Sequence, residues 1–394
     1  MRLNRNLHLA YSTNVHRGET WRETFDALKT HTLAVREKIS PHGEPFGIGL
    51  RLSNCAAIGL SDRERLLEFQ RWLGRNNCYV FTMNGFPYGK FHADRIKENV
   101  YRPDWTSPER LGYTNLLFDL LAQLVPAGIE GSVSTLPGSF KEFNLSGDAL
   151  KMVRQNIWHC VEHISHVSEE TGRQLHLGLE PEPLCLLESS AETIHFFERL
   201  RAEHPRDARL NDHLGVNYDT CHFAVEFEEA QNALPCLLDY KIKISKIHLS
   251  SALKLRPTPE AIEELKKFSD DTYFHQVVVR DENGGRMIYR DLPEALSNPQ
   301  FAVRNPERDE WRVHFHVPLH APAAPPLDNT NDHLLGVLDL LAEYPDFCPH
   351  LEMETYTWEV LPPEFKTPNV ADQLAAEYDW TLARLKERGL ANGP

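Results

Sequence analysis

The sequence lacks the basic segments that would hold a nucleic acid. It carries 57 acidic against 42 basic residues, a formal net charge of -15, and no run rich in Lys and Arg. A phosphate backbone requires a positively charged protein face, which an acidic chain without such a run does not offer. We therefore expect no nucleic acid among the partners of this protein.

Cysteine is sparse, and its spacing argues against a thiol-based site. The seven cysteines are far apart and form no C-x-x-C pair, whereas disulfide frameworks and Cys-based zinc sites use closely patterned cysteines. Long apolar runs are also missing: no stretch reaches the length of a membrane span, and residues 1–14 contain no apolar signal segment. These absences predict a reduced, cytoplasmic protein without membrane insertion.

What the sequence does have is a regular alternation of short apolar runs with amphipathic helical patterns. Strand followed by helix, repeated about eight times, predicts a parallel sheet with helical crossovers. The turn after the first strand has no glycine-rich phosphate fingerprint, which argues against a dinucleotide-binding open sheet. We therefore predict an α/β fold, a (β/α)8 TIM barrel. The nine candidate strands, one more than a barrel needs, are residues 8–11, 46–52, 78–83, 129–136, 176–180, 214–219, 243–250, 312–319 and 350–356.

The chain is longer than a barrel requires. A TIM barrel takes about 250 residues and this chain has 394, so we expect one barrel domain over residues 1–394 with insertions. One insertion follows the third strand, at residues 84–104, where Gly, Pro and aromatic residues predict a structured loop. The other lies between the seventh and eighth strands, at residues 252–309, with a helix over 259–268 and a β-hairpin. Asn283-Gly284 between two β-prone runs is the signal for that hairpin.

Acidic and imidazole side chains gather at the ends of four successive strands. In a TIM barrel the chemistry lies at the carboxyl ends of the strands. The last four barrel strands end in segments that contain Glu180, Asp219, His248 and a pair of glutamates, Glu352 and Glu354. Clustered carboxylates repel and shift one another's pKa, whereas a divalent cation would hold them together. The mixed oxygen and nitrogen ligands suit Mn²⁺, Mg²⁺, Co²⁺ or Zn²⁺.

Each of these residues also has a purely structural interpretation. Glu180 could cap a helix or pair with an arginine, and a lone strand histidine such as His248 is commonly a satisfied core residue. Glu352 and Glu354 are two apart and share a face of their strand, so at most one of them is expected to contact the metal. The pair His314 and His316 has the same spacing and could be ligands or part of a half-exposed edge strand.

A further group of residues could bind substrate or support the ligands. Asp219 and His222 form a D-x-x-H pattern, in which a chain leaving a strand can bring both side chains to one point. For the candidates that come before residue 100, a surface or helix-capping role is the alternative. The substrate-binding or supporting candidates are His16, Arg51, Lys90, His92, Glu182, His222, His314, His316 and Glu352.

The segments GLEPEP, DTCH, KIHLS and METY resemble the metal site of the xylose-isomerase-like TIM barrels. That superfamily includes sugar isomerases, ketose 3-epimerases, inosose dehydratases and endonuclease IV. The resemblance implies that Glu180, Asp219, His248 and Glu354 bind the metal, with the two glutamates also acting as acid and base. It implies that His222 contacts substrate or a second metal. The implied reaction is isomerisation, epimerisation or dehydration of a small sugar, polyol or cyclitol-like substrate, through an enediolate formed by proton transfer α to a carbonyl.

Three longer motifs resemble one branch of that superfamily, the EboE family of metabolite traffic proteins. They are YSTNVHRGETW, NGFPYGKFH with VYRPDW, and LEMETYTWEVLP. This resemblance spans nearly the whole chain and implies a second interpretation, a non-catalytic protein that binds a cyclitol-like metabolite and its metal without turnover.

The sequence departs from the small epimerases in one segment, and a nuclease is an alternative function. The segment VHFHVPLH departs from the small epimerases, which leaves open whether His314 or His316 adds a ligand for a second metal, as a D-x-H element does in endonuclease IV. An endonuclease IV-like nuclease would need a basic surface, which the net charge of -15 opposes. Barrels of this superfamily often dimerise, so the resemblance also implies a homodimer as one option.

Overall fold

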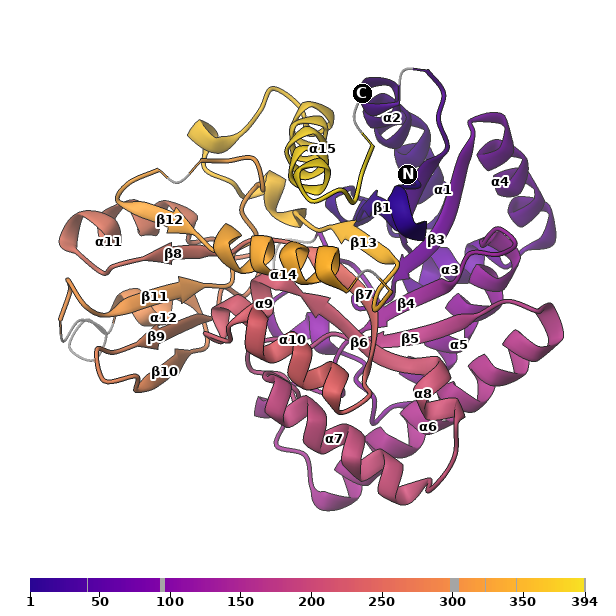
Figure 1. Cartoon of the computed structure of the whole chain (residues 1–394), viewed down its shortest axis with the longest axis horizontal. Coiled ribbons are helices and arrows are strands. Elements are labelled where there is room, and N and C mark those ends of the chain that lie inside the picture. Colours follow the sequence, from indigo (N-terminus) through magenta and orange to yellow (C-terminus); the bar gives the residue numbers. More distant parts are fainter. Residues whose placement is uncertain (41, 93–95, 298–304, 323, 345, 393–394) are drawn as a thin grey trace.

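The computed structural model describes residues 1–40, 42–92, 96–297, 305–322, 324–344 and 346–392. At its centre is a sheet of eight parallel strands in the order β1-β13-β7-β6-β5-β4-β3-β2 (Figure 1). A parallel bridge between Ser12 and Gly49 joins the two ends of that order and closes the barrel. The (β/α)8 TIM barrel predicted from the sequence is confirmed. Its strands are β1 (His8–Tyr11), β2 (Phe46–Arg51), β3 (Cys78–Asn84), β4 (Gly131–Thr135), β5 (Leu175–Leu179), β6 (Leu214–Asp219), β7 (Lys243–Leu249) and β13 (His350–Met353).

The barrel strands are almost entirely buried on both faces. Parallel sheets covered on both sides have near-continuous apolar runs, which is why eight of the nine predicted strands are found at the expected places. The ninth, residues 312–319, is not a barrel strand. Only its first residues belong to a strand, β11 (Glu310–Val313), because the Phe315 N–H donates to the Val313 carbonyl (2.7 Å) and turns the chain.

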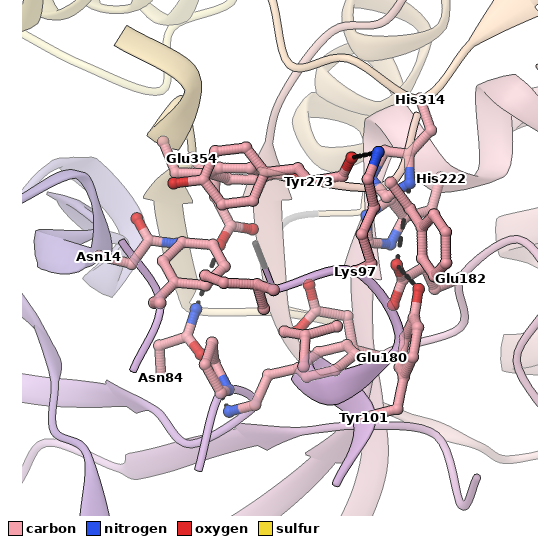
Figure 2. A pocket seen from close by; sticks show the side chains of 17 residues that line it. Asn14, Asn84, Lys97, Tyr101, Glu180, Glu182, His222, Tyr273, His314 and Glu354 are labelled. Carbon is pink, nitrogen blue, oxygen red and sulfur yellow. Dashed lines mark hydrogen bonds and ion pairs between the residues drawn. The ribbon is translucent and has the colours of Figure 1, made fainter. Parts of the chain in front are cut away.

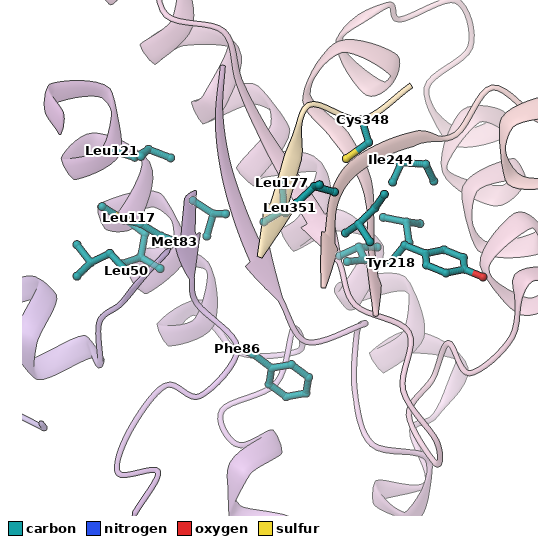
Figure 3. Packing of buried hydrophobic residues seen from close by; sticks show 14 of the residues in the cluster. Leu50, Met83, Phe86, Leu117, Leu121, Leu177, Tyr218, Ile244, Cys348 and Leu351 are labelled. Atoms are coloured by element: carbon teal, nitrogen blue, oxygen red, sulfur yellow. The ribbon is translucent and has the colours of Figure 1, made fainter. Parts of the chain in front are cut away.

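Helices form the outer layer of the barrel (Figure 1). Their ends follow local signals: Ser107 caps the helix that Pro108 begins, and Gly172 ends the longest helix in a left-handed conformation. Met83 of β3 and Leu117 of α5 belong to the core between strands and helices (Figure 3). The helices are α1 (Trp21–Ala27), α2 (Leu33–Ile39), α3 (Asn54–Leu60), α4 (Arg63–Arg75), α5 (Pro108–Leu124), α6 (Gly147–Thr171), α7 (Ser190–Glu203), α8 (Arg209–His213), α9 (Thr220–Val225), α10 (Ala230–Asp239), α14 (Asn331–Glu343) and α15 (Val370–Glu387).

A second, antiparallel sheet lies beside the barrel, at the left of Figure 1. It is inserted between β7 and β13 and includes the β9–β10 hairpin at Asn283-Gly284. It has its own apolar core, in which Trp311 packs with Leu265 of α11 (Pro259–Leu265). The sheet continues beyond residue 309, and residues 298–304 of the expected insertion lie outside the described residues. Its strands, in the order β10-β9-β11-β8-β12, are β8 (Leu253–Leu255), β9 (Val277–Arg280), β10 (Arg286–Tyr289), β11 and β12 (Leu327–Asn329).

The loop after β3 connects the barrel to this inserted sheet. The Ile96 N–H donates to the Thr272 carbonyl (3.0 Å), and Lys97 Nζ forms an ion pair with Asp291 (2.6 Å). Residues 93–95 of this loop lie outside the described residues. The loop and the insertion therefore meet over one end of the barrel. Searching the described helices for a long apolar segment finds none that could cross a membrane.

Candidate metal centre

Four side chains from four neighbouring barrel strands meet at one point. Glu180 follows β5, Asp219 ends β6, His248 lies on β7 and Glu354 follows β13. Each contributes one oxygen or nitrogen atom, and these four atoms all lie within 4.8 Å of one another. All four residues are at most 4% exposed. The carboxyl ends of the strands thus place three acids around one imidazole in a buried site.

His248 is the centre of this group. Its Nδ1 lies 3.1 Å from Glu180 Oε1 and 3.4 Å from Asp219 Oδ2, and it also contacts Glu354 Oε2. Burial acts to lower the pKa of His248, but the carboxylates around it, Glu354 foremost, raise that pKa well above its ordinary value. A single imidazole therefore lies within a group that carries three carboxylates.

The carboxylates in this group differ in how readily they ionise. Burial raises the pKa of Glu354, and the charge of Glu180 raises it further against the opposing effect of His248. Burial also opposes ionisation of Asp219, but His222 and other nearby imidazoles hold its pKa well below the ordinary value. The pKa values of acids that share one site differ in this way.

The donor set fits a divalent cation. Glu180 Oε2 and Asp219 Oδ2 are buried, and neither has a hydrogen-bond partner within the described part of the chain. Leaving a buried polar atom unpaired is costly, and a cation would supply the missing interaction. Three carboxylates and one imidazole are ligands that Mn²⁺, Mg²⁺, Co²⁺ and Zn²⁺ accept.

Glu352 supports the group from the other side of His248. Its Oε2 accepts a hydrogen bond from Lys246 Nζ (2.5 Å) and lies 3.1 Å from His248 Nε2. Burial opposes its ionisation, but Lys246 and His248 lower the pKa of Glu352 to about 2. This contact orients the ring so that Nδ1 faces the other three carboxylates, as acidic neighbours of metal-binding histidines do.

A cleft opens above Glu180 and Glu354. Figure 2 shows Asn14, Asn84 and Glu354 on one side of it, and Glu182, His222 and His314 on the other. Aromatic side chains form much of its wall, two of them from the insertion. These aromatic residues are Phe86, Phe91, Tyr101, Tyr273, Phe274 and Tyr356. A mostly apolar cleft with a few convergent polar groups is the usual form of a small-molecule site.

Three histidines lie beside Asp219. His222 and His314 line the cleft, and His316 follows with its ring 5.5 Å from that of His222. His314 and His316 are 3% and 0% exposed, which contradicts the half-exposed edge strand considered for them. Burial, with the nearby imidazoles, lowers the pKa of both rings.

Glu182 lies at the edge of the same cleft. It accepts a hydrogen bond from the Tyr101 hydroxyl (2.9 Å) and lies 3.8 Å from His314 Nδ1. Burial raises its pKa well above the ordinary value, and the nearby carboxylate of Glu180 adds to that rise.

The four remaining substrate-binding candidates do not line the cleft; they are His16, Arg51, Lys90 and His92. His16 and Arg51 line a separate small cavity, where Arg51 donates to the carbonyls of Gly18 (2.8 Å) and Gly89. Lys90 is exposed. His92 bridges the Asn14 carbonyl (2.6 Å) and the Tyr273 hydroxyl (2.8 Å), so it connects the first barrel loop to the insertion. Arg51 and His92 thus hold loops together.

Sequence reasoning missed two amides that touch Glu354. Asn14 and Asn84 donate to Glu354 Oε1 at 2.6 and 3.1 Å. Asn84 ends β3, so the strand-end criterion would have found it if amides had been considered along with acids and imidazoles. No local pattern distinguishes Tyr273 and Phe274, which reach the cleft only through the fold of the insertion.

Comparisons with known proteins support the fold. No protein-family model matches the chain, and no curated protein is significantly similar to it in sequence. Among solved structures, a xylose isomerase-like TIM barrel protein from Mycobacterium smegmatis in complex with magnesium is 12% identical, with a TM-score of 0.52. That match covers 98% of this chain and 99% of that one. An L-ribulose 3-epimerase is also 12% identical, with a TM-score of 0.51 and coverage of 98% and 96%. The chain therefore shares the TIM-barrel fold of these two proteins.

Proposed function

We propose that this protein is a divalent-metal-dependent isomerase or epimerase that acts on a sugar or a cyclitol-like polyol. The observation that carries the proposal is the position of two glutamates. Glu180 and Glu354 come from the outer two of four neighbouring strands, so Asp219 and His248 lie between them. In this proposal all four residues hold the metal, and the two glutamates also move protons.

The two glutamates are held differently, which suits different roles. Glu180 Oε2 has no hydrogen-bond partner among the residues described, and in this proposal the carboxylate binds the metal through one oxygen and takes a proton from a carbon next to a carbonyl through the other. Glu354 Oε1 is fixed by Asn14 and Asn84. In this proposal Glu354 delivers a proton to the opposite face of the substrate.

The remaining groups orient the substrate. A bound divalent cation would act as a Lewis acid toward a carbonyl and its neighbouring hydroxyl. The aromatic wall offers flat apolar surfaces to the carbon skeleton of a polyol, while Glu182 and His222 offer polar atoms at the edge. Removal and return of the proton through an enediolate gives epimerisation or isomerisation.

Hydrogen exchange tests the proposal directly. Metal-loaded protein would be incubated in D₂O with a panel of cyclitols, ketoses and their phosphates, and deuterium incorporation followed by NMR. We expect incorporation at a carbon next to the carbonyl, and a loss of about 10²–10⁴-fold in Glu180→Gln, the usual contribution of a general base. The control is Glu226→Gln, which changes a buried acid paired with Arg286 outside the cleft.

The principal rival is a non-catalytic carrier of the EboE type, favoured by the sequence motifs. Stoichiometric ligand binding without exchange across the whole panel would contradict the isomerase and support the carrier. A homodimer, implied by the same resemblance, is a separate proposal that sedimentation velocity tests.

A further inference from the structure

The lining of the cleft is divided between polar and apolar side chains. Most of the polar ones belong to the candidate metal centre or lie next to it, as Asn14 and Asn84 do beside Glu354 (Figure 2). The rest of the lining consists of the six aromatic residues named above, together with Pro87, Ile96, Lys97 and Val100. A ligand that reaches the metal centre therefore also meets a large apolar surface.

Three of the aromatic rings form one continuous wall. The ring of Phe91 lies 5.3 Å from that of Tyr273 and 5.1 Å from that of Tyr356, and the last two rings are 5.3 Å apart. They come from the loop after β3, from the insertion and from the segment after β13. The insertion thus completes an apolar wall that the barrel alone does not form.

The tyrosine hydroxyls around the cleft already have partners. The Tyr101 hydroxyl donates to Glu182 Oε1 (2.9 Å), and the Tyr273 hydroxyl contacts His92 Nδ1 (2.8 Å). A sugar hydroxyl against these rings would give up its water without gaining a side-chain partner, which is costly. An apolar group in the same place gains free energy by leaving water.

The cleft also offers little to a phosphate. Among the described residues that line it, Lys97 is the sole lysine or arginine. Its Nζ donates to the carbonyls of Tyr273 (2.8 Å) and Asp270 (3.2 Å) and pairs with Asp291 (2.6 Å). An ammonium group has three hydrogens, so these contacts use all of them. The carboxylates of the metal centre would in addition repel an anion.

We propose that the substrate is a hydroxy-carbonyl compound with an apolar substituent remote from its carbonyl, and that this substituent lies against Phe91, Tyr273 and Tyr356. The proposal rests on the proposed function, because the metal centre would hold the carbonyl end. A free sugar or a sugar phosphate would leave the aromatic wall without a partner. The insertion then selects the substrate, while the barrel strands carry the chemistry.

Matched ligands test the apolar wall by binding alone. Metal-loaded full-length protein would be titrated in a calorimeter with D-fructose, 6-O-benzyl-D-fructose and D-fructose 6-phosphate, and with the same three derivatives of D-tagatose. We expect each benzyl ether to bind at least about 10-fold more tightly than its parent ketose, because even one methylene in an apolar pocket can be worth that much. The phosphates should bind no more tightly than the parents.

A pair of variants locates the effect. Phe91→Ala should lose most of the advantage of the benzyl ethers. The control is Tyr88→Ala in the same loop, whose ring contacts that of Tyr113 (5.1 Å) and does not line the cleft. It should keep the advantage.

The unchanged protein decides the outcome, so the test does not depend on the folding of a variant. Equal affinity for the benzyl ethers and their parents, tighter binding of the phosphates, or no binding of the benzyl ethers would overturn the apolar subsite. Tight binding of the benzyl ethers without deuterium exchange would leave the subsite standing and remove the isomerase. Deuterium exchange in the parent ketoses without any preference for the benzyl ethers would do the reverse.

Discussion

At the scale of single residues, the contact between Glu352 and His248 in the proposed metal centre depends on a glycine, Gly49. A Cβ atom on Gly49 would lie 1.9 Å from Glu352 Oε1 and 2.8 Å from the Tyr11 carbonyl oxygen. Any side chain at this position of β2 must therefore displace the Glu352 carboxylate. Since Glu352 holds His248 by its Nε2, the displacement would reach the ligand group.

We expect Gly49→Ala to weaken metal binding by about 10–100-fold, the usual effect of losing a group that orients a ligand. Competition with a fluorescent chelator measures the affinity. Gly74→Ala is the matched control, because a Cβ there meets none of the described atoms within 4 Å. In α4 that change should stabilise the fold by up to about 1 kcal/mol. Equal metal affinity in the two variants would show that Glu352 does not matter for binding.

The sequence could predict the position of a site residue where the strand alone fixes its side chain. Glu180, Asp219 and His248 are fixed by their strands, so strand position alone brings them together. Arg51 also ends a strand, yet its guanidinium turns to the loop carbonyls of Gly18 and Gly89. The direction of a long side chain depends on loops that no local pattern specifies.

At the scale of elements, strands were predictable and their assignment to sheets was not. The β6 strand occupies the expected residues 214–219, because a buried parallel strand is one apolar run. Apolar and polar residues alternate over 312–319 as in a strand, but a turn after Val313 ends the strand there. That turn places His314 and His316 beside the barrel, and it depends on backbone contacts with Gln276 and Ser251 that lie far away in sequence.

Helix α15 carries a buried acid next to the site. Glu377 accepts hydrogen bonds from Thr355 Oγ1 (2.8 Å) and Gln373 Nε2 (3.2 Å). Burial raises its pKa to about 8 in spite of these bonds. It therefore binds α15 to the segment that follows Glu354, and it does so as a neutral group at neutral pH.

This buried acid makes stability depend on pH. Folded Glu377 keeps its proton up to about pH 8, whereas the unfolded chain releases it near the ordinary value of 4.5. The unfolded state then binds fewer protons, so this group lowers stability by up to about 1.4 kcal/mol per pH unit as pH rises between these values. We expect Glu377→Gln to gain stability relative to the unchanged protein between pH 5.5 and 8, measured by urea denaturation. A constant difference across that range would contradict the assignment.

At the scale of the whole molecule, removing metal should destabilise the fold. Without a cation, three buried carboxylates share one imidazole, and a ligand present at 100 times its Kd stabilises by about 2.7 kcal/mol. We expect a chelator to lower the thermal midpoint in calorimetry, and added Mn²⁺ or Zn²⁺ to restore it. The shift should disappear in Asp219→Asn and persist in Glu226→Gln. A midpoint that does not respond to chelator would argue against a bound metal.

The order of the strands has a consequence for when a metal could bind during folding. β13 enters the barrel between β1 and β7, with His350 in register with His8. Pairing strands so distant in sequence is slow, and Glu354 follows the last barrel strand in chain order. A chain still being synthesised has no complete ligand set before that strand docks. We therefore expect the full affinity for a metal only after β13 has docked.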